Sequence, residues 1–180
     1  MNSFTNLLKE RYSCRRYLSK DIPDENIEKI LYDATLAPST NNRQPWTFTV
    51  LKNKEIISKI SIMLREAGLE KDDPAIVKTA QAIYEAPVLI CVFNKEVNDE
   101  SISIIQSIGA CIENMLLSAT ELKINSLWIR ATYCIEKEIE KLLNKEEEHL
   151  MACVTLGYSA KEINHEKNRN KVNEITKYIL

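Results

Sequence analysis

A polar loop that reads Ala37-Pro38-Ser39-Thr40-Asn41-Asn42-Arg43-Gln44-Pro45-Trp46 joins a segment of helical periodicity to a segment of β-strand character. Pro38 stops the preceding helix because it lacks a backbone N–H, and Pro45 favours an extended conformation for Gln44. The loop is rich in neutral side chains that both donate and accept hydrogen bonds, among them Thr40, Asn41, Asn42 and Gln44. Groups of this kind suit the edge of a heterocycle better than an ion. The loop is therefore predicted to be rigid, anchored at both ends, and able to bind a polar ring.

Two short basic clusters lie near the ends of the chain. The first places Arg11, Ser13 and Arg15 at alternate positions, where an extended backbone would point them the same way about 6.6 Å apart. Two guanidinium groups and a hydroxyl on one face would bind a phosphate or a polar ring well. Lys167 and Arg169 repeat the alternate spacing near the C-terminus. Basic clusters are also common on solvated surfaces, so the residues alone leave both interpretations open.

The hydrophobic periodicity alternates between helix and strand along the whole chain, without a linker or a repeat. Helices are expected at residues 4–10, 24–37, 56–68, 75–85, 102–122 and 136–144, and Gly68 is expected to close the third of them. Strands are expected at residues 46–51, 87–93, 126–131 and 149–156. The continuous apolar run at 87–93 is typical of the middle of a sheet. The pattern predicts a three-layer αβα protein that forms one domain over residues 1–180.

The composition limits the partners of this chain. A net charge of -2 and a pI near 5.8 indicate no basic face for nucleic acid or for an anionic membrane. The N-terminus lacks a basic segment followed by an apolar run, and no stretch reaches the roughly 18 apolar residues that span a membrane. We therefore expect a cytoplasmic protein whose basic groups bind a small molecule.

The scarcity of glycine excludes several kinds of phosphate site. Only Gly68, Gly109 and Gly157 are present, so neither the dinucleotide motif G-x-G-x-x-G nor a Walker loop occurs in the chain. The G-x-S-x-G motif of hydrolases is missing as well. Any bound phosphate must then be held mainly by side chains, which strengthens the case for the two basic clusters.

The five cysteines are odd in number and widely separated. Most of them lie in apolar runs and are expected to be reduced core residues. Cys14, between Ser13 and Arg15, is assigned to the core in preference to a reactive thiolate. His149 and His165 are far apart in sequence, and there is no Cys-x-x-Cys motif, so no metal site is expected.

Taken in order, these motifs resemble those of the flavin-dependent nitroreductase family. The order is R-x-S-x-R near the N-terminus, a helix ending in A-P-S, N-x-x-Q-P-W entering a strand, a long apolar helix, and a C-terminal K-x-R. The resemblance covers nearly the whole chain. It implies an α+β fold, a nitroreductase-like three-layer αβα sandwich with a mixed or antiparallel central sheet. It also implies an intertwined homodimer with extended termini that embrace the partner, and the small patch Gly109-Ala110-Cys111 fits the close approach of another helix.

The resemblance assigns FMN as the cofactor and divides its binding into three parts. The basic clusters would hold the phosphate, the backbone N–H groups of Arg130 and Ala131 would face the N5 and O4 edge, and loop 38–41 would come from the other subunit. Arg15 would lie closer to the pyrimidine end of the ring. Tyr12 would either pack against neighbouring side chains or contact the ring. The full set of expected contacts is Arg11, Tyr12, Ser13, Arg15, Pro38, Ser39, Thr40, Asn41, Gln44, Ile129, Arg130, Ala131, Lys167 and Arg169.

By the same resemblance, the expected function is that of an FMN-dependent NAD(P)H oxidoreductase. NADH or NADPH would reduce the flavin at N5, and a nitroaromatic, quinone or related small acceptor would reoxidise it in a ping-pong sequence. No catalytic side chain is expected, because the flavin carries the chemistry. Two alternatives stay open: an FMN-binding sensor or reservoir without efficient turnover, and a flavin-free dimeric interaction module.

One segment departs from the family pattern. Many relatives carry a glycine-rich turn of the type L-G-L-G-S-C-W-I-G, whereas residues 122–130 read Leu-Lys-Ile-Asn-Ser-Leu-Trp-Ile-Arg. Arg130 therefore stands where a small or acidic residue is common. Its side chain would cover the flavin, select the substrate by charge, or point to solvent.

Overall fold

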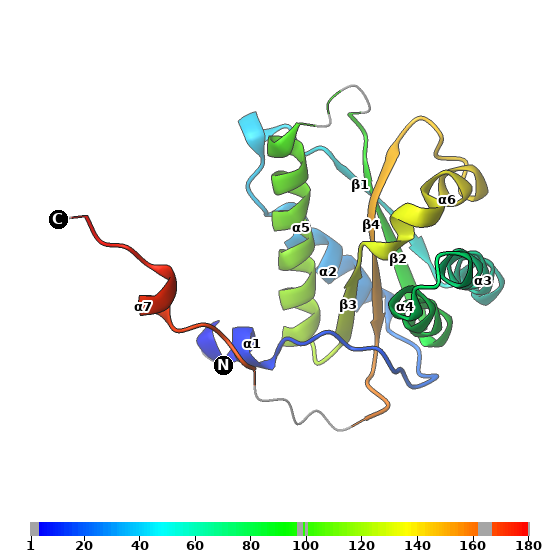
Figure 1. The fold of residues 1–180 in the computed structure, drawn as a ribbon, viewed down its shortest axis with the longest axis horizontal. Coiled ribbons are helices and arrows are strands. Elements are labelled where there is room, and N and C mark those ends of the chain that lie inside the picture. The colour runs from blue at the N-terminus through cyan, green and yellow to red at the C-terminus, as the bar shows by residue number, and fades with distance from the viewer. Residues whose placement is uncertain (1–3, 97–98, 100, 162–166, 180) are drawn as a thin grey trace.

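The computed structural model describes residues 4–96, 99, 101–161 and 167–179. Its central sheet contains β1 (Trp46–Leu51), β2 (Val88–Asn94), β3 (Asn125–Ile129) and β4 (His149–Gly157), in the spatial order β1-β2-β4-β3 (Figure 1). Each neighbouring pair of strands is antiparallel. An isolated parallel bridge between Ser13 and Ser126 adds the N-terminal segment beside β3. The mixed or antiparallel sheet expected from the sequence is therefore confirmed.

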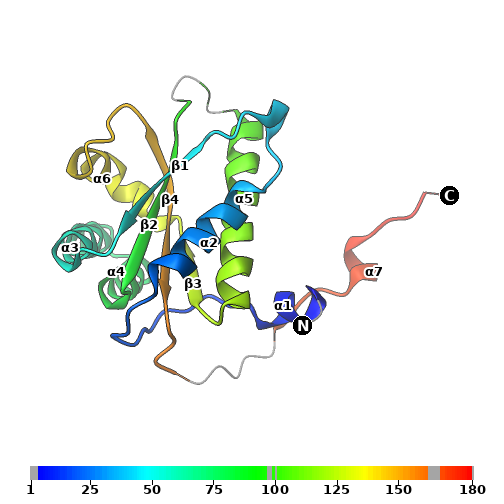
Figure 2. The ribbon, with the colours of Figure 1, turned by 180° about the vertical axis from the view of Figure 1, so that it is seen from behind.

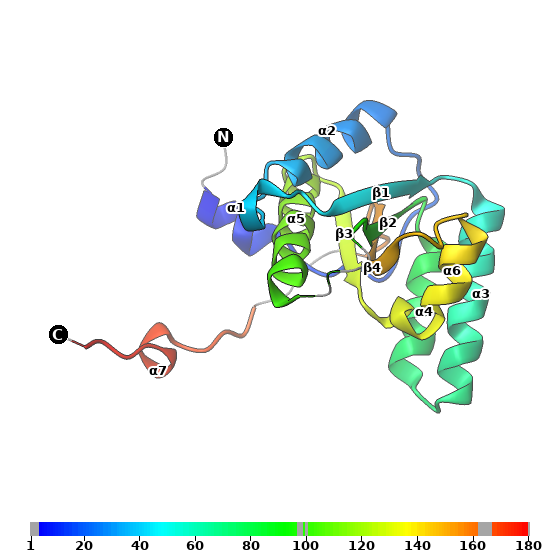
Figure 3. The same cartoon turned by 90° about the horizontal axis from the view of Figure 1, so that it is seen from above.

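Helices cover both faces of the sheet (Figure 1, Figure 3). α2 (Asp24–Thr35) and α5 (Ile102–Glu121) lie on one face. α3 (Lys54–Glu70), α4 (Pro74–Glu85) and α6 (Glu136–Leu142) lie on the other. α1 (Phe4–Glu10) and α7 (Val172–Ile175) belong to the terminal segments. This arrangement confirms the three-layer αβα sandwich.

β2 lies between two hydrophobic cores, and all seven of its residues are buried. Val88, Ile90 and Val92 pack into the core beneath α2 and α5. The residues between them pack into the core beneath α3, α4 and α6. Because alternate side chains of a strand point to opposite faces, a strand covered on both sides must be apolar throughout. Burial on both faces of the sheet therefore explains the apolar run at residues 87–93.

α5 is the longest helix in the described ranges and crosses one face of the sheet (Figure 1). By length and composition alone α5 could cross a membrane, but a helix packed in the core of a domain meets the same criteria. Half of its most apolar window is buried inside the domain, where Ile108, Ile112 and Met115 belong to the core shared with α2. Packing on the sheet accounts for the apolar sequence of α5.

Three boundaries differ from the sequence expectations for identifiable reasons. α2 ends at Thr35 and not at residue 37. Gly68 does not close the third helix, since α3 continues to Glu70 and α4 packs so closely that an added Cβ would lie 2.9 Å from Ile76 Cγ2. The strand expected at 126–131 ends at Ile129, because Arg130 has helical dihedral angles and leads into the 3-10 helix η2 (Ala131–Ile135). The other expected bounds agree to within two residues.

The C-terminal segment 167–179 leads away from the rest of the domain in the front and rear views (Figure 1, Figure 2). Its apolar side chains are largely exposed, with Val172 at 69%, Tyr178 at 76% and Ile179 at 88%. Within the described chain, this segment therefore presents apolar surface to solvent.

Candidate functional site

The two basic clusters meet beside the middle of α5. Lys167 Nζ donates a hydrogen bond to the backbone oxygen of Leu8 over 2.7 Å, although these residues are 159 positions apart. Burial of the amine, and then the positive charges of Arg11 and Arg169, lower the pKa of Lys167, while Glu113 opposes this effect. Arg11 Nε lies 3.9 Å from Glu113 Oε1 on α5. Three cations gathered beside one carboxylate form the charge pattern of an anion site.

The N-terminal segment that carries the first cluster is extended along β3. Cys14 N donates to the backbone oxygen of Ser126 over 2.9 Å. This pairing turns Cys14 into the interior and leaves Ser13 and Arg15 exposed on the other side. Arg15 Nη1 donates to the backbone oxygen of Ser13 over 3.3 Å. The core assignment of Cys14 is confirmed, because alternate side chains of an extended chain point in opposite directions.

Tyr12 belongs to the packing beneath this segment. It is partly buried against a small cluster formed by Cys14, Tyr17 and Ala86. Burial raises the pKa of the Tyr12 phenol, which therefore stays protonated at neutral pH. Tyr12 therefore packs against the domain, and its contact with the flavin ring stays a prediction.

The polar loop contains the 3-10 helix η1 (Thr40–Asn42) and a strained backbone. The φ angle is 51° at Asn41, 55° at Asn42 and 48° at Gln44. Asparagine tolerates this left-handed region, whereas holding other non-glycine residues there costs on the order of 1–3 kcal/mol. The extended conformation expected for Gln44 is therefore wrong. Its backbone N–H instead donates to Ser39 Oγ over 3.0 Å, and this hydrogen bond closes the loop. Gln44 adopts this conformation although the following Pro45 favours an extended backbone.

Side-chain contacts fix this loop to α5 and to the segment after β2. Thr40 N donates to Ser107 Oγ on α5 over 3.1 Å. Arg43 Nη1 donates to Asp99 Oδ2 over 2.7 Å, and Arg43 also pairs with Glu96. The loop lies at the N-terminal end of α5, whereas α1 lies near the opposite end (Figure 1). A single chain therefore holds the loop rigidly but does not bring it to the basic clusters.

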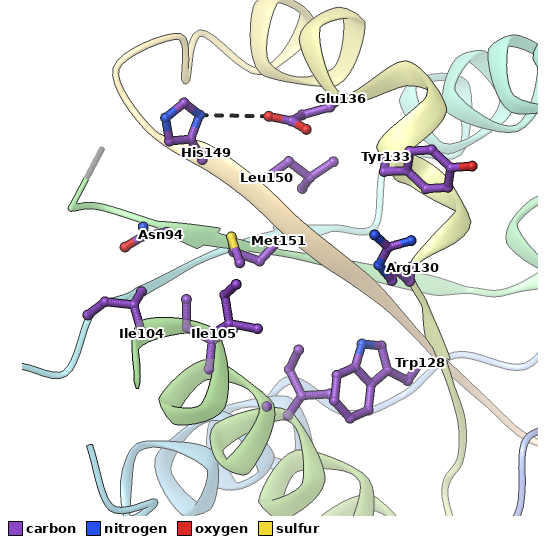
Figure 4. A pocket seen from close by; sticks show the side chains of 13 residues that line it. Asn94, Ile104, Ile105, Trp128, Arg130, Tyr133, Glu136, His149, Leu150 and Met151 are labelled. Atoms are coloured by element: carbon purple, nitrogen blue, oxygen red, sulfur yellow. Dashed lines mark ion pairs between the residues drawn. The ribbon is translucent and has the colours of Figure 1, made fainter. Parts of the chain in front are cut away.

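A cavity of about 450 Å³ opens between α5, the end of β3, the start of β4 and η2 (Figure 4). Ile105 and Ile108 of α5 give it an apolar wall, and Trp128 of β3 gives it an aromatic one. Gly109 also lines the cavity, and a Cβ added there would lie 3.6 Å from Trp128 Cη2. Cys111, from the same small patch, is buried in the core. In the described chain, Gly109 therefore faces the cavity with space for a Cβ beside Trp128, and Cys111 packs inside the domain.

Arg130 brings a positive charge to this cavity. Its guanidinium carbon lies 4.9 Å from the centroid of the Tyr133 ring, and both side chains line the cavity (Figure 4). Among the described residues, no carboxylate lies within 4.0 Å of the Arg130 guanidinium. The side chain of the preceding Ile129 is buried in the opposite core, so only its backbone faces this region. Arg130 thus offers the cavity an unneutralised cation stacked on an aromatic ring.

At the far end of the cavity, Glu136 and Glu140 of α6 meet His149 at the start of β4. His149 Nδ1 lies 3.7 Å from Glu136 Oε1 and 3.9 Å from Glu140 Oε1. No sequence pattern indicated that these side chains meet, because His149 belongs to a different element and no short motif links it to α6. His165, the other histidine considered in the sequence, lies outside the described residues.

Comparisons with known proteins bear on the family and the fold of this chain. The model of the nitroreductase family matches residues 8–158. A protein of Archaeoglobus fulgidus, provisionally named an NADH dehydrogenase/NAD(P)H nitroreductase, is 31% identical over 166 residues, which cover 90% of this chain and 88% of the relative. The structure of a BluB-like flavoprotein from Clostridium difficile has a TM-score of 0.82 at 28% identity, with 99% of this chain and 100% of that chain covered. A nitroreductase with bound FMN from Bacteroides fragilis gives the same four values.

The α+β sandwich and the match to the nitroreductase family model place the protein among the oxidoreductases. The chain belongs to the nitroreductase family, whose model spans most of its length. The resemblance found in the order of the motifs is thereby confirmed.

Proposed function

We propose that this chain is an FMN-dependent NAD(P)H oxidoreductase that reduces small acceptors such as nitroaromatics and quinones. The observation that carries the proposal is the gathering of Arg11, Lys167 and Arg169 from opposite ends of the chain. When bound, FMN supplies hydride transfer through its N5, from NADH or NADPH to the acceptor in a ping-pong sequence. The relatives named for FMN or for NAD(P)H support the same function.

The FMN phosphate fits the cationic cluster. The chain has only three glycines, so side chains must replace a glycine-rich phosphate loop. A hydrogen bond between a cationic side chain and a phosphate contributes roughly 1.5–3 kcal/mol. A bound dianion would also offset the mutual repulsion of Arg11, Lys167 and Arg169. The exposed hydroxyl of Ser13, on the outer side of the same segment, would add a neutral donor.

The flavin ring would occupy the cavity between α5, β3 and η2. The isoleucines of α5 and the ring of Trp128 offer apolar contact to its faces. η2 begins at Ala131, and the first N–H groups of a helix have no acceptor within the helix. The N–H groups of Arg130 and Ala131 would therefore donate to the polar N5 and O4 edge. Arg15 would lie nearer the pyrimidine end.

A second copy of the chain would complete each site. The loop with Pro38, Ser39, Thr40, Asn41 and Gln44 is rigid but remote from the basic clusters of its own chain. A homodimer would let this loop approach the ring of the partner and would cover the apolar C-terminal segment. We further propose that residues 1–180 form a single FMN-binding domain that acts in the cytoplasm without nucleic acid or membrane partners.

Steady-state turnover tests this function. The purified protein should be yellow, and heat should release FMN identified by chromatography. Oxidation of NADH or NADPH in the presence of a quinone or a nitroaromatic should give the parallel double-reciprocal lines of a ping-pong reaction. A protein that neither retains nor takes up flavin would contradict the proposal.

A second candidate function is an FMN-binding sensor or reservoir without efficient turnover. The position of Arg130 favours it, since this bulky side chain lines the cavity where an acceptor would enter. Retained FMN combined with negligible turnover of every donor and acceptor pair would support this alternative.

Replacing Gly109 with leucine should reduce FMN retention. A Cβ at position 109 meets Trp128 at an ordinary contact distance of 3.6 Å, so the further carbons of leucine must enter the cavity. Gly109→Ala is the matched control and should retain FMN. The ratio of FMN to protein after gel filtration, with the Tm of each variant, measures the effect. Unchanged FMN content in a folded Gly109→Leu variant would place the ring elsewhere.

Replacing Arg130 with glycine should speed reoxidation of the reduced protein by bulky neutral quinones. The change removes the guanidinium from the face of Tyr133 and widens the cavity, while FMN affinity should stay nearly constant because only the backbone would reach the ring. Stopped-flow reoxidation by a neutral quinone and by its sulfonated analogue measures both size and charge selection. Arg130→Lys, which keeps the charge, is the control. Equal rates in all three proteins would show that the side chain plays no part in acceptor access.

A further inference from the structure

Three ligand-type side chains converge at the far end of the cavity, away from the basic clusters. One ligand atom from each of Glu136, Glu140 and His149 lies within 4.8 Å of the other two. The His149 Nδ1 distances of 3.7 and 3.9 Å to the two carboxylates exceed those of hydrogen bonds, about 2.7–3.2 Å. Ligand atoms on one tetrahedral Zn²⁺ lie roughly 3.3–3.6 Å apart, given metal–ligand bonds of about 2.0–2.2 Å. The two His149 distances exceed this spacing by only a few tenths of an ångström, and no pair of the three atoms is more than 4.8 Å apart, so small side-chain rotations would let all three bind one ion.

The buried carboxylate of this cluster is already oriented. Glu140 is 1% exposed, and its Oε1 accepts a hydrogen bond from Leu150 N over 3.0 Å. A carboxylate oxygen has two lone pairs, so Oε1 can accept from Leu150 N and bind a cation together. Metal-binding carboxylates are commonly held by such an additional hydrogen bond.

Lys137 is the cation that now occupies part of this site. Its Nζ lies 2.9 Å from Glu140 Oε2 and 3.4 Å from Glu136 Oε1. One ammonium group balances only one of the two carboxylates. The Lys137 side chain is 69% exposed and can turn into solvent, whereas the side chain of its partner Glu140 is only 2% exposed. A divalent ion would have to displace this ammonium group from the two carboxylates to bind there.

We propose that Glu136, Glu140 and His149 bind one divalent transition-metal ion of the Zn²⁺ type. One imidazole and two carboxylates suit Zn²⁺, whereas Mg²⁺ and Ca²⁺ prefer oxygen ligands throughout. Glu136 and His149 line the cavity, so the remaining coordination position faces its interior (Figure 4). The site uses residues outside the expected flavin contacts, so the metal proposal does not depend on the proposed oxidoreductase activity.

Calorimetric titration of the chelator-dialysed protein with ZnCl₂ tests the site. We expect one Zn²⁺ per chain and no comparable binding of Mg²⁺. His149→Gln and Glu136→Gln should each weaken Zn²⁺ binding about tenfold or more, the scale of losses at metal sites. Glu138→Gln is the matched control, because Glu138 lies exposed on the same helix and outside the cluster. It should bind Zn²⁺ as the unsubstituted protein does.

Lys137→Ala gives the sharpest discrimination, because removing the competing ammonium should tighten Zn²⁺ binding several-fold. Weaker or unchanged Zn²⁺ binding in that variant would overturn the proposal. So would the absence of one-to-one binding, or an equal loss of Zn²⁺ affinity in the Glu136→Gln and Glu138→Gln variants. If circular dichroism shows that His149→Gln does not fold, the Zn²⁺ affinities of the Glu136→Gln and Lys137→Ala variants decide whether the site exists. FMN content and turnover of the same samples report separately on the proposed function.

Discussion

Arg169→Ala is expected to weaken FMN binding roughly 10- to 100-fold while leaving riboflavin binding nearly unchanged. A charge-assisted hydrogen bond to phosphate contributes roughly 1.5–3 kcal/mol, and each 1.4 kcal/mol corresponds to about a factor of ten. Riboflavin lacks the phosphate, so its affinity should not change when a phosphate contact is lost. Titration of the flavin-free protein with each ligand, followed by quenching of flavin fluorescence, measures both affinities.

The control for this prediction is Arg65→Ala. Arg65 is exposed on α3, on the opposite face of the sheet from α5, so its loss removes one positive charge without touching the cluster. FMN affinity should not change in this variant. Equal weakening of FMN and riboflavin by Arg169→Ala would place Arg169 away from the phosphate.

Replacing Val172, Ile175 and Ile179 together with serine should convert a dimeric protein into monomers. These side chains are 69%, 68% and 88% exposed in the single chain, on a segment that leads away from the domain. Apolar surface gathered in this way is typical of a protein interface. Light scattering at micromolar concentration measures the oligomeric state, and FMN content should fall with dimerisation if each site is composite.

Substitution of Lys171 and Lys177 by serine provides the comparison, because it alters the same segment without removing apolar surface. This variant should remain dimeric. A monomeric unsubstituted protein that retains FMN would contradict the composite site. A dimer that survives the triple serine substitution would show that other surfaces hold the two chains together.

Much of the architecture follows from sequence patterns whose cause is local or periodic. The apolar run at 87–93 predicts a central strand because both faces of β2 are covered. The alternation around Cys14 predicts which side chains of the N-terminal segment turn inward. The two prolines of loop 37–46 predict its position between a helix and a strand, and the contacts of Thr40 and Arg43 fix it there.

The features that the sequence did not predict depend on contacts between distant elements or on competing local forces. Gly68 looks like a helix terminus, but its lack of a side chain serves the close packing of α4 on α3. Gln44 departs from the extended conformation because the hydrogen bond to Ser39 outweighs the preference imposed by Pro45. His149 meets Glu136 only because α6 folds back beside the start of β4.

Anaerobic stopped-flow mixing of the purified, FMN-loaded protein with NADH and with NADPH tests the central claim most directly. The loss of flavin absorbance reports hydride transfer to the bound cofactor. An FMN-dependent oxidoreductase should show at least one nicotinamide reducing the bound flavin much faster than free FMN, at a rate that saturates with nicotinamide concentration. Reduction by both nicotinamides no faster than that of free FMN would contradict the oxidoreductase assignment and favour a flavin-binding sensor.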